Sequence, residues 1–346
     1  MKKEIRLFLS MSVTAMAILV VISFTKDCDG ALIKMIDKFY LTHKVVDTDT
    51  SNSTVFETMD DRLINTALVL EGGSLRSLYT SGVLDVFMEN GLEFSCVIGV
   101  SAGALNAANY VAKHIGRSAK INIMHSNDPN YFGVRQFLLK RSIFNFDYLF
   151  YTPIKDLYPY AEDVLMNSKQ RFWVGATNCE TGNIVYFEKK NYDDLVKVLQ
   201  ASSSIPLVCK PFKIDSLTYL DGAISDPIGV NKAFSEGYNK VVVVLTRHYE
   251  YKREKTSWLV KFLYKMTYRK YPELITTLDN NFDQYNLLME KINKLEKENK
   301  IFVIRPSCEK KIKALEKDAR KLTDLYFLGR DDTRTLLPKM FEYINR

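Results

Sequence analysis

A serine lies between two glycines in the stretch VIGVSAG, residues 97–103. The apolar residues before Ser101 predict a buried strand, and the Ala- and Asn-containing residues after it predict a helix. A serine at such a corner projects its hydroxyl clear of both elements, and Gly99 and Gly103 leave space for a tight backbone. A bare G-x-S-x-G also fits a purely structural turn, but the flanking strand and helix favour a nucleophile.

A glycine-rich turn precedes this serine by thirty residues, in the segment EGGSLRS, Glu71–Ser77. Backbone N–H groups crowded at a helix N-terminus form a cradle for an anion. The spacing matches neither G-x-G-x-x-G nor a P-loop, whereas an ester hydrolase needs such a cradle for the oxyanion of its tetrahedral intermediate. We expect Gly73 and Ser74 to supply the N–H groups, and Arg76 to add positive potential or to contact a lipid headgroup.

A third motif, YLDGAISDPI, places Asp221 before Gly222 and Ala223 at the end of an extended segment. An Asp-Gly pair by itself predicts only a turn. In this order, however, the glycine-rich turn, G-x-S-x-G and D-G-A resemble the patatin-like phospholipase family. The resemblance extends over about residues 66–250. It implies a three-layer α/β sandwich with a mostly parallel central sheet, and a Ser-Asp dyad that hydrolyses acyl esters.

The resemblance implies a role for each matching residue. Ser101 is the nucleophile and Asp221 its partner. The turn that would hold the oxyanion consists of Gly72, Gly73, Ser74 and Arg76. Two positions depart from the family pattern, because Ser74 and Ser77 stand where glycines are expected. A Cβ at Ser74 is costly if that residue needs a positive φ, which reduces the expected activity.

In such a dyad the aspartate takes the serine proton directly, and later activates water, without an imidazole. An alternative hypothesis is an α/β-hydrolase with a catalytic triad. His248 follows the predicted strand 240–245, as the histidine of such a triad does. Another alternative is a catalytically silent lipid-binding protein, which the serines at the two glycine positions favour. We also expect Asp226, Asn178 and Asn106 to turn or cap the chain, although the two asparagines also suit a pocket wall.

The sequence indicates no metal or cofactor. It contains no D-x-D-x-D-G loop for Ca²⁺, so metal-independent hydrolysis is expected. Five scattered cysteines include no C-x-x-C pair, which argues against a zinc ribbon and a disulfide framework and predicts free, mostly packed thiols. We expect the partners to be a membrane lipid or another acyl ester and a membrane surface, with no nucleic acid; the oligomeric state stays open.

The net charge of +7 belongs to the C-terminal part of the chain. Residues 240–346 contain 24 Lys and Arg against 15 Asp and Glu. No nucleic-acid motif accompanies them, so an anionic membrane is the favoured partner and a solvated basic face is the alternative. Within this part, Thr256–Tyr271 predicts a basic amphipathic helix with aromatic residues, suited to a membrane interface, to a lid, or to ordinary packing on the core.

The N-terminus carries the other membrane signal. Three basic residues precede Leu7–Phe24, which contains no charge and as a helix would be about 27 Å long. No clear signal-peptide exit is visible, so residues 1–25 are expected to be an uncleaved anchor, with a buried helix as the alternative. The positive-inside rule then places the catalytic domain outside the cytoplasm. Residues 26–65, rich in Asp, Ser and Thr towards their end, predict a tether.

Strand and helix patterns alternate beyond the tether. Strands are expected at 67–71, 97–100, 172–177, 184–187, 240–245 and 301–304, and helices at 77–90, 283–299 and 309–344. With 346 residues and 47% hydrophobic content, the chain is long enough for one large core. The predicted organisation is a catalytic core at 66–250 and a mainly helical, basic extension at 251–346 that packs on it.

Overall fold

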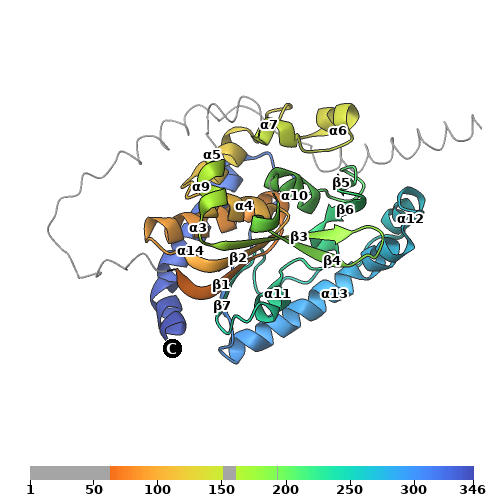
Figure 1. Cartoon of the computed structure of the whole chain (residues 1–346). Helices are drawn as coiled ribbons and strands as arrows, with labels where there is room; N and C mark the ends of the chain where they lie inside the picture. The colour runs from red at the N-terminus through yellow and green to blue at the C-terminus, as the bar shows by residue number, and fades with distance from the viewer. Residues whose placement is uncertain (1–62, 151–160, 193) are drawn as a thin grey trace, which may run out of the picture.

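The computed structural model describes residues 63–150, 161–192 and 194–346 (Figure 1). The predicted anchor and nearly all of the predicted tether lie outside these residues. The strands are β1 (Ile64–Leu70), β2 (Phe94–Val100), β3 (Arg171–Asn178), β4 (Ile184–Glu188), β5 (Phe212–Ile214), β6 (Leu217–Asp221), β7 (Val241–Val244) and β8 (Phe302–Ile304).

The helices and 3₁₀ turns alternate with these strands. They are η1 (Ser74–Ser77), α3 (Leu78–Glu89), α4 (Ala102–Val111), α5 (Arg117–Met124), α6 (Val134–Lys140), α7 (Phe146–Phe150), α9 (Glu162–Asn167), η2 (Lys189–Asn191), α10 (Leu195–Ser202), η3 (Gly222–Ile224), α11 (Val230–Ser235), α12 (Trp258–Thr267), α13 (Pro272–Lys297) and α14 (Ala319–Asn345).

The strands of the described chain form one sheet in the order β5-β6-β3-β2-β1-β7-β8, and β4 pairs with β3. The ladders between β3, β2, β1, β7 and β8 are parallel, whereas β4, β5 and β6 pair antiparallel at one end. The parallel strands are continuous apolar runs such as Val241–Val244, because helices cover both of their faces. The predicted α/β class with a mostly parallel sheet is confirmed.

Alternating side chains of the parallel strands enter two separate cores. On β1, Leu68 and Leu70 pack into the core under α3, α4, α10 and α14, while Ala67 and Val69 pack into the core under α11 and α13. Figure 1 shows these helices on opposite sides of the sheet. The protein is therefore a three-layer sandwich, as predicted.

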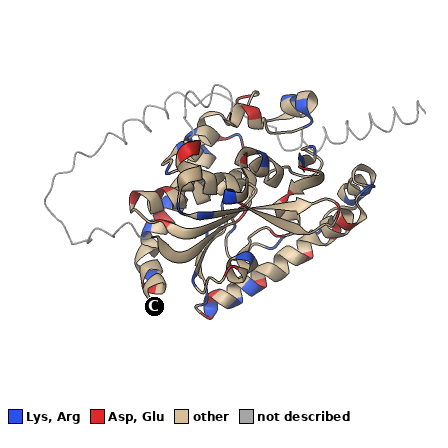
Figure 2. Ribbon diagram, viewed as in Figure 1, with Lys and Arg blue, Asp and Glu red and all other residues tan. Residues whose placement is uncertain are grey.

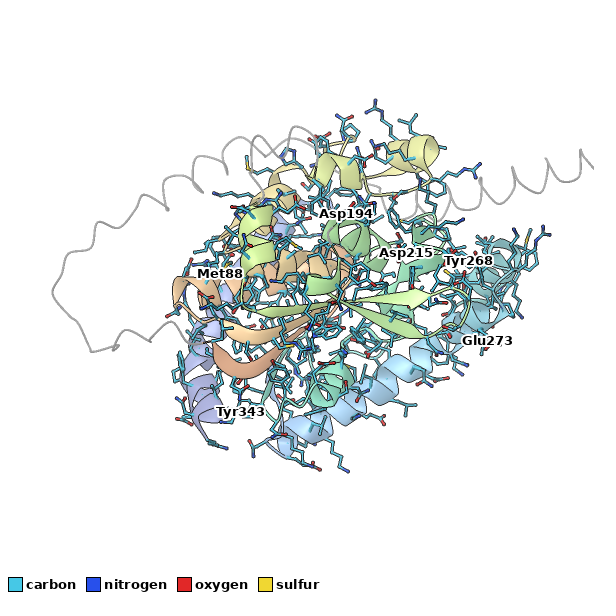
Figure 3. All side chains as sticks on the ribbon, in the orientation of Figure 1. Met88, Asp194, Asp215, Tyr268, Glu273 and Tyr343 are labelled. Carbon is cyan, nitrogen blue, oxygen red and sulfur yellow. The ribbon has the colours of Figure 1, made fainter. Side chains whose placement is uncertain are left out.

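The C-terminal segment completes the sandwich. It contributes β8, which extends the sheet beyond β7, and α14, which packs closely on α3. A Cβ on Gly329 would lie 2.1 Å from the carbonyl oxygen of Tyr79, so only glycine permits this helix crossing. The hydroxyl of Tyr343, labelled in Figure 3, accepts from the Val241 N–H at 2.9 Å and donates to the Lys300 carbonyl at 3.0 Å.

The charged residues follow this layering. Figure 2 shows Lys, Arg, Asp and Glu gathered on the outer helices, while the strands are mostly uncharged. Two predicted helices differ in extent: α13 begins at Pro272, well before residue 283, and α14 begins at Ala319, after the N-cap Asp318, rather than at 309. In the described part of the chain, no helix is both long and apolar enough to cross a bilayer.

Candidate active site

The sheet register brings the two predicted catalytic residues together. On β3, Gly175 pairs with Val100 and the next residue, Ala176, pairs with Asp221. Because β4 occupies the other edge of β3 along residues 173–177, β2 and β6 share one edge and meet end to end. Ser101, which follows Val100, therefore lies beside Asp221, although 120 residues separate them in the chain.

Ser101 occupies the tight corner between β2 and α4. Its backbone has φ 54° and ψ −129°, a conformation that non-glycine residues adopt at a cost of roughly 1–3 kcal/mol. The glycines on either side permit the close packing around it: a Cβ on Gly99 would lie 2.5 Å from the Ala104 Cα, and one on Gly103 would lie 2.5 Å from the Leu70 carbonyl oxygen. The two glycines are therefore needed because neighbouring backbone atoms lie too close for a Cβ, and not because φ is positive.

The Ser101 hydroxyl donates a hydrogen bond to Oδ2 of Asp221 at 2.6 Å. Both residues are 5% exposed. The second carboxylate oxygen accepts the Ala223 N–H at 2.8 Å, so the D-G-A motif orients its own aspartate. Burial raises the pKa of Asp221 to about 6, and the hydrogen bonds from Ser101 and Ala223 oppose that rise. The carboxyl group is thus suited to accept and return a proton near neutral pH.

The end of α10 supports both members of this pair, a role that the sequence reasoning missed. The hydroxyl of Ser202 accepts the Ser101 N–H at 2.8 Å and donates to the Gly175 carbonyl at 2.6 Å. Two residues on, the Ser204 carbonyl accepts the Asp221 N–H at 2.9 Å. The signal was present in the sequence as three consecutive serines at the end of an apolar helix.

The glycine-rich turn passes directly over Ser101. A Cβ on Gly72 would lie 3.0 Å from the Cβ of Ser101, and the Gly72 N–H is already bonded to the Pro227 carbonyl. The N–H groups of Gly73 and Ser74 have no acceptor among the described residues and remain available to an oxyanion. Ser74 has φ 50°, so the positive-φ cost considered for this serine applies.

A mostly apolar cavity opens from Ser101. About 830 Å³ of space lies between its walls, a volume that includes open solvent, and about 70 Å³ of it can hold the centre of a water-sized sphere. Ser101 and Ser74 lie at its wall, and its apolar lining includes Leu75, Leu78, Leu105, Ile121, Tyr131, Phe144, Phe146, Leu149 and Ile205. Such a wall suits a hydrocarbon chain whose reacting carbonyl lies at the serine.

Comparisons with known proteins found matches for two parts of the chain. A family model described as patatin-like phospholipase matches residues 68–234. The chain contains a patatin-like phospholipase domain. A second model, a domain of unknown function named DUF6363, matches residues 271–345, the segment that supplies β8 and α14.

One curated relative of the patatin-like phospholipase domain is the "Uncharacterized protein YjjU" of Escherichia coli strain K12. It is 31% identical over 187 residues, which cover 52% of this chain and 51% of the relative. The chain thus matches about half the length of that protein. Among solved structures, VipD from Legionella pneumophila aligns over 79% of this chain and 67% of its own, with 12% identity and a TM-score of 0.40.

Two of the residues considered in the sequence analysis do not line the cavity. The side chain of Arg76 lines a different hollow, on the other side of the turn. His248 lines that hollow too, and its charged neighbour is Glu250, with 3.9 Å between Nε2 and Oε2. The structure therefore places the histidine of the rival triad beside neither Ser101 nor Asp221.

The remaining predicted polar residues have structural partners. Asp226 accepts the N–H groups of Ile228 and Gly229 at the start of α11, and Asn178 accepts those of Glu180 and Thr181, which confirms their turn and capping roles. Asn106 differs, because it lines the cavity while its amide donates to the Ser77 carbonyl at 2.8 Å.

The four described cysteines carry free thiols, as predicted, and three of them are buried: Cys96, Cys179 and Cys209. Within the described ranges, no three His, Cys, Asp or Glu side chains gather as a metal site would require.

Proposed function

We propose that the protein is a lipid acyl ester hydrolase that works through a Ser101–Asp221 dyad and an acyl-enzyme. The observation that carries the proposal is the 2.6 Å hydrogen bond between a strained serine and a buried carboxyl group at the wall of an apolar cavity. The patatin-like phospholipase domain supports the broader class of ester hydrolases. The dyad, its order of steps and its substrate are our own inference.

The proposed reaction assigns each proton to a named group. Asp221 accepts the Ser101 proton as Oγ attacks the ester carbonyl, and the N–H groups of Gly73 and Ser74 bind the resulting oxyanion. Asp221 then returns the proton to the leaving alcohol oxygen, which leaves the acyl group on Ser101. In the deacylation step, a water molecule attacks the acyl-enzyme while Asp221 removes a proton from that water. Asp221 then gives the proton back to Ser101 when the fatty acid departs.

The substrate class follows from the walls around the dyad. An apolar cavity lined by leucines and aromatic rings favours a fatty acyl chain over a small polar ester. Two outer helices expose large apolar side chains in a basic setting: Leu138 and Leu139 on α6, and Trp258 and Phe262 on α12. These surfaces suit contact with anionic lipid, so we include a membrane surface among the partners.

The apolar side chains of the helix predicted in Thr256–Tyr271 differ in their exposure on α12. Leu263 is buried against the protein, as a packing helix requires, whereas Trp258 is 78% exposed and Phe262 is 51% exposed. The exposed pair supports the interfacial role. The N-terminal anchor and an extracytoplasmic catalytic domain remain part of the proposal and rest on the sequence alone.

A catalytically silent lipid-binding protein is the second candidate. It is favoured by the φ of 50° at Ser74, because an L-residue there costs roughly 1–2 kcal/mol and weakens the hold on an oxyanion donor. The intact pair of Ser101 and Asp221 favours the enzyme.

Labelling with a fluorophosphonate probe separates the two candidates. The hydrolase predicts stoichiometric labelling of the wild-type protein, and loss of labelling in Ser101→Ala. The matched control is Ser203→Ala, which removes a hydroxyl from the same cavity wall. Unlabelled, folded wild-type protein, or labelling that survives Ser101→Ala, would contradict the hydrolase.

A further inference from the structure

A second hollow opens at the same edge of the sheet as the Ser101 cavity. Its walls come from the residues that follow three neighbouring parallel strands: Arg76 after β1, residues between 246 and 254 after β7, and residues between 306 and 312 after β8. The crevice outside the carboxyl ends of parallel strands is where α/β sheets commonly bind ligands. The DUF6363 segment supplies one wall, so the site exists only where it meets the patatin-like domain.

Two guanidinium groups in this hollow lack carboxylate partners. Among the described residues, neither Arg76 nor Arg247 forms an ion pair: the guanidinium of Arg247 lies over the ring of Tyr251, and the enclosed Nε of Arg76 has no acceptor. The nearby Arg253 and Arg305 do have side-chain acceptors, which are the amide oxygen of Asn281 and the carboxylate of Glu296, respectively.

Arg76 and Arg247 are also close enough to affect each other. Burial first, and the charge of Arg247 second, lower the pKa of Arg76 to about 10. The charge of Glu71 opposes this shift, and both of its oxygens already accept hydrogen bonds: Oε2 from the N–H and hydroxyl of Thr246, and Oε1 from Tyr285. An anion between the two guanidinium groups would relieve this repulsion and supply the missing acceptors.

The other charged side chains of the wall are mixed. Lys252 and Lys310 add positive charge, while the exposed Glu250, Glu254 and Glu309 oppose it. Arg76 and Arg247 are partly buried, whereas the lysines and glutamates of the wall are exposed, so the two guanidinium groups are the more enclosed charges of the hollow.

We propose that this hollow binds a phosphate group, carried by a soluble phosphomonoester or polyphosphate, or by a lipid headgroup. Two guanidinium groups offer paired, planar donors, which match the several oxygens and double charge of phosphate better than a single carboxylate. This site is separate from the Ser101 cavity and its existence does not rest on the proposed hydrolysis.

Occupancy of this site would act on the turn that holds the oxyanion donors. The Arg76 N–H donates to the Gly73 carbonyl at 3.1 Å, so the same short turn presents Ser74 to the cavity and Arg76 to the hollow. A phosphate held by Arg76 restrains this turn, including the strained Ser74. Phosphate binding and the geometry of the oxyanion donors are thereby coupled.

Binding can be measured on the full-length protein by calorimetric titration with inorganic phosphate and with pyrophosphate. A second arm measures flotation with phosphatidylcholine vesicles that contain phosphatidic acid. The test variant is Arg247→Gln, and the matched control is Lys311→Gln, which removes one positive charge from an exposed neighbour of the hollow that is not part of its wall. Circular dichroism establishes that both variants are folded.

The proposal expects saturable binding that Arg247→Gln weakens by about 10- to 100-fold and Lys311→Gln leaves within about twofold. If Arg247→Gln but not Lys311→Gln weakens binding in the calorimetric titration, the ligand is a soluble phosphate compound. If this difference between the variants is seen only with vesicles, the ligand is a lipid headgroup. Equal weakening by both variants would mean nonspecific attraction and would overturn the site. Absence of binding in both arms, or binding unaffected by Arg247→Gln, would overturn it as well.

Discussion

The two hollows at the carboxyl edge of the sheet lie on opposite sides of one short turn, yet they offer opposite chemistry. The surface of the Ser101 cavity is mainly apolar and includes the nucleophilic serine, whereas the surface of the Arg76 hollow is mainly polar. The sheet determines where loops converge, and the side chains on those loops decide what can bind. The turn η1, which contributes to both walls, is the physical link between them.

The largest expected effect is a loss of ester hydrolysis at the Ser101 cavity without a loss of phosphate binding at the Arg76 hollow. Asp221→Asn should lower the rate of ester hydrolysis by about 10² to 10⁴, because the amide cannot accept the serine proton. Phosphate binding at Arg76 should remain. Rates with a chromogenic fatty acyl ester and calorimetry on the same preparation provide the two measurements.

His248→Ala is the control for this prediction, since that side chain lies in the Arg76 hollow. It should leave hydrolysis nearly unchanged. If the histidine variant is inactive and the asparagine variant active, the dyad is the wrong assignment.

The pH dependence of hydrolysis should reflect the raised pKa of Asp221, which is about 6. The base must be ionised to act, so kcat/KM should fall about tenfold per pH unit below that value and level off above it. Rates between pH 4.5 and 8 with an uncharged ester test this. A profile that stays flat from pH 5 to 7 would contradict a carboxylate base with this pKa.

The same group should destabilise the fold as pH rises. Its folded pKa lies above its unfolded value of 3.8, so between about pH 4 and 6 the native state binds more protons than the unfolded state, and the free energy of unfolding falls. Asp221→Asn removes this contribution. Urea unfolding at pH 4 and pH 6.5 should therefore show a smaller loss of stability with pH in the variant than in the wild type; an equal loss would argue against a buried Asp221.

The exposed apolar side chains of α6 should affect the hydrolysis of aggregated lipid but not that of a soluble ester. Leu139→Asp places a negative charge on an exposed leucine of α6 and should weaken hydrolysis of anionic vesicles by about tenfold. Hydrolysis of a soluble short-chain ester should be unchanged. Leu287→Asp on α13 is the matched control, because that leucine is also exposed, and an equal loss in both variants would remove α6 from the interface.

The smallest expected effect concerns the turn shared by the two hollows. Ser74→Gly permits the φ of 50° at lower cost, but glycine also gains freedom in the unfolded chain. The net gain in the free energy of unfolding should be below about 1 kcal/mol, with hydrolysis equal to or a few-fold above that of the wild type. A clear loss of hydrolysis would show that the serine hydroxyl has a role of its own.

Much of this arrangement is visible in the sequence, because parallel strands are continuous apolar runs. The run at 240–245 predicts β7 almost to the residue, and the apolar residues before Ser101 predict the C-terminal half of β2. The motifs also predict which residues meet, since their order matches a family with a fixed topology. The distance between Ser101 and Asp221 depends instead on the register of β3, which no local pattern encodes.

The remaining differences have local causes. The sequence analysis begins α13 only at residue 283, although proline is favoured in a first helical turn and the buried Leu274 and Leu278 are spaced as on one helix face. Residues 309–318 are as charged as a surface helix but contribute instead to the wall of the Arg76 hollow. The direction of the Arg76 side chain was not predictable, since a turn of this kind can present a side chain to either side.

The central claim, an acyl-enzyme on Ser101, is tested most directly by mass spectrometry of rapidly quenched reactions. Wild-type protein is mixed with a long-chain fatty acyl ester, quenched within milliseconds to seconds and digested. We expect a peptide containing Ser101 that is heavier by the acyl group, and neither adduct nor turnover in Ser101→Ala. Turnover that persists in Ser101→Ala, or an acyl adduct on a different residue, would contradict it.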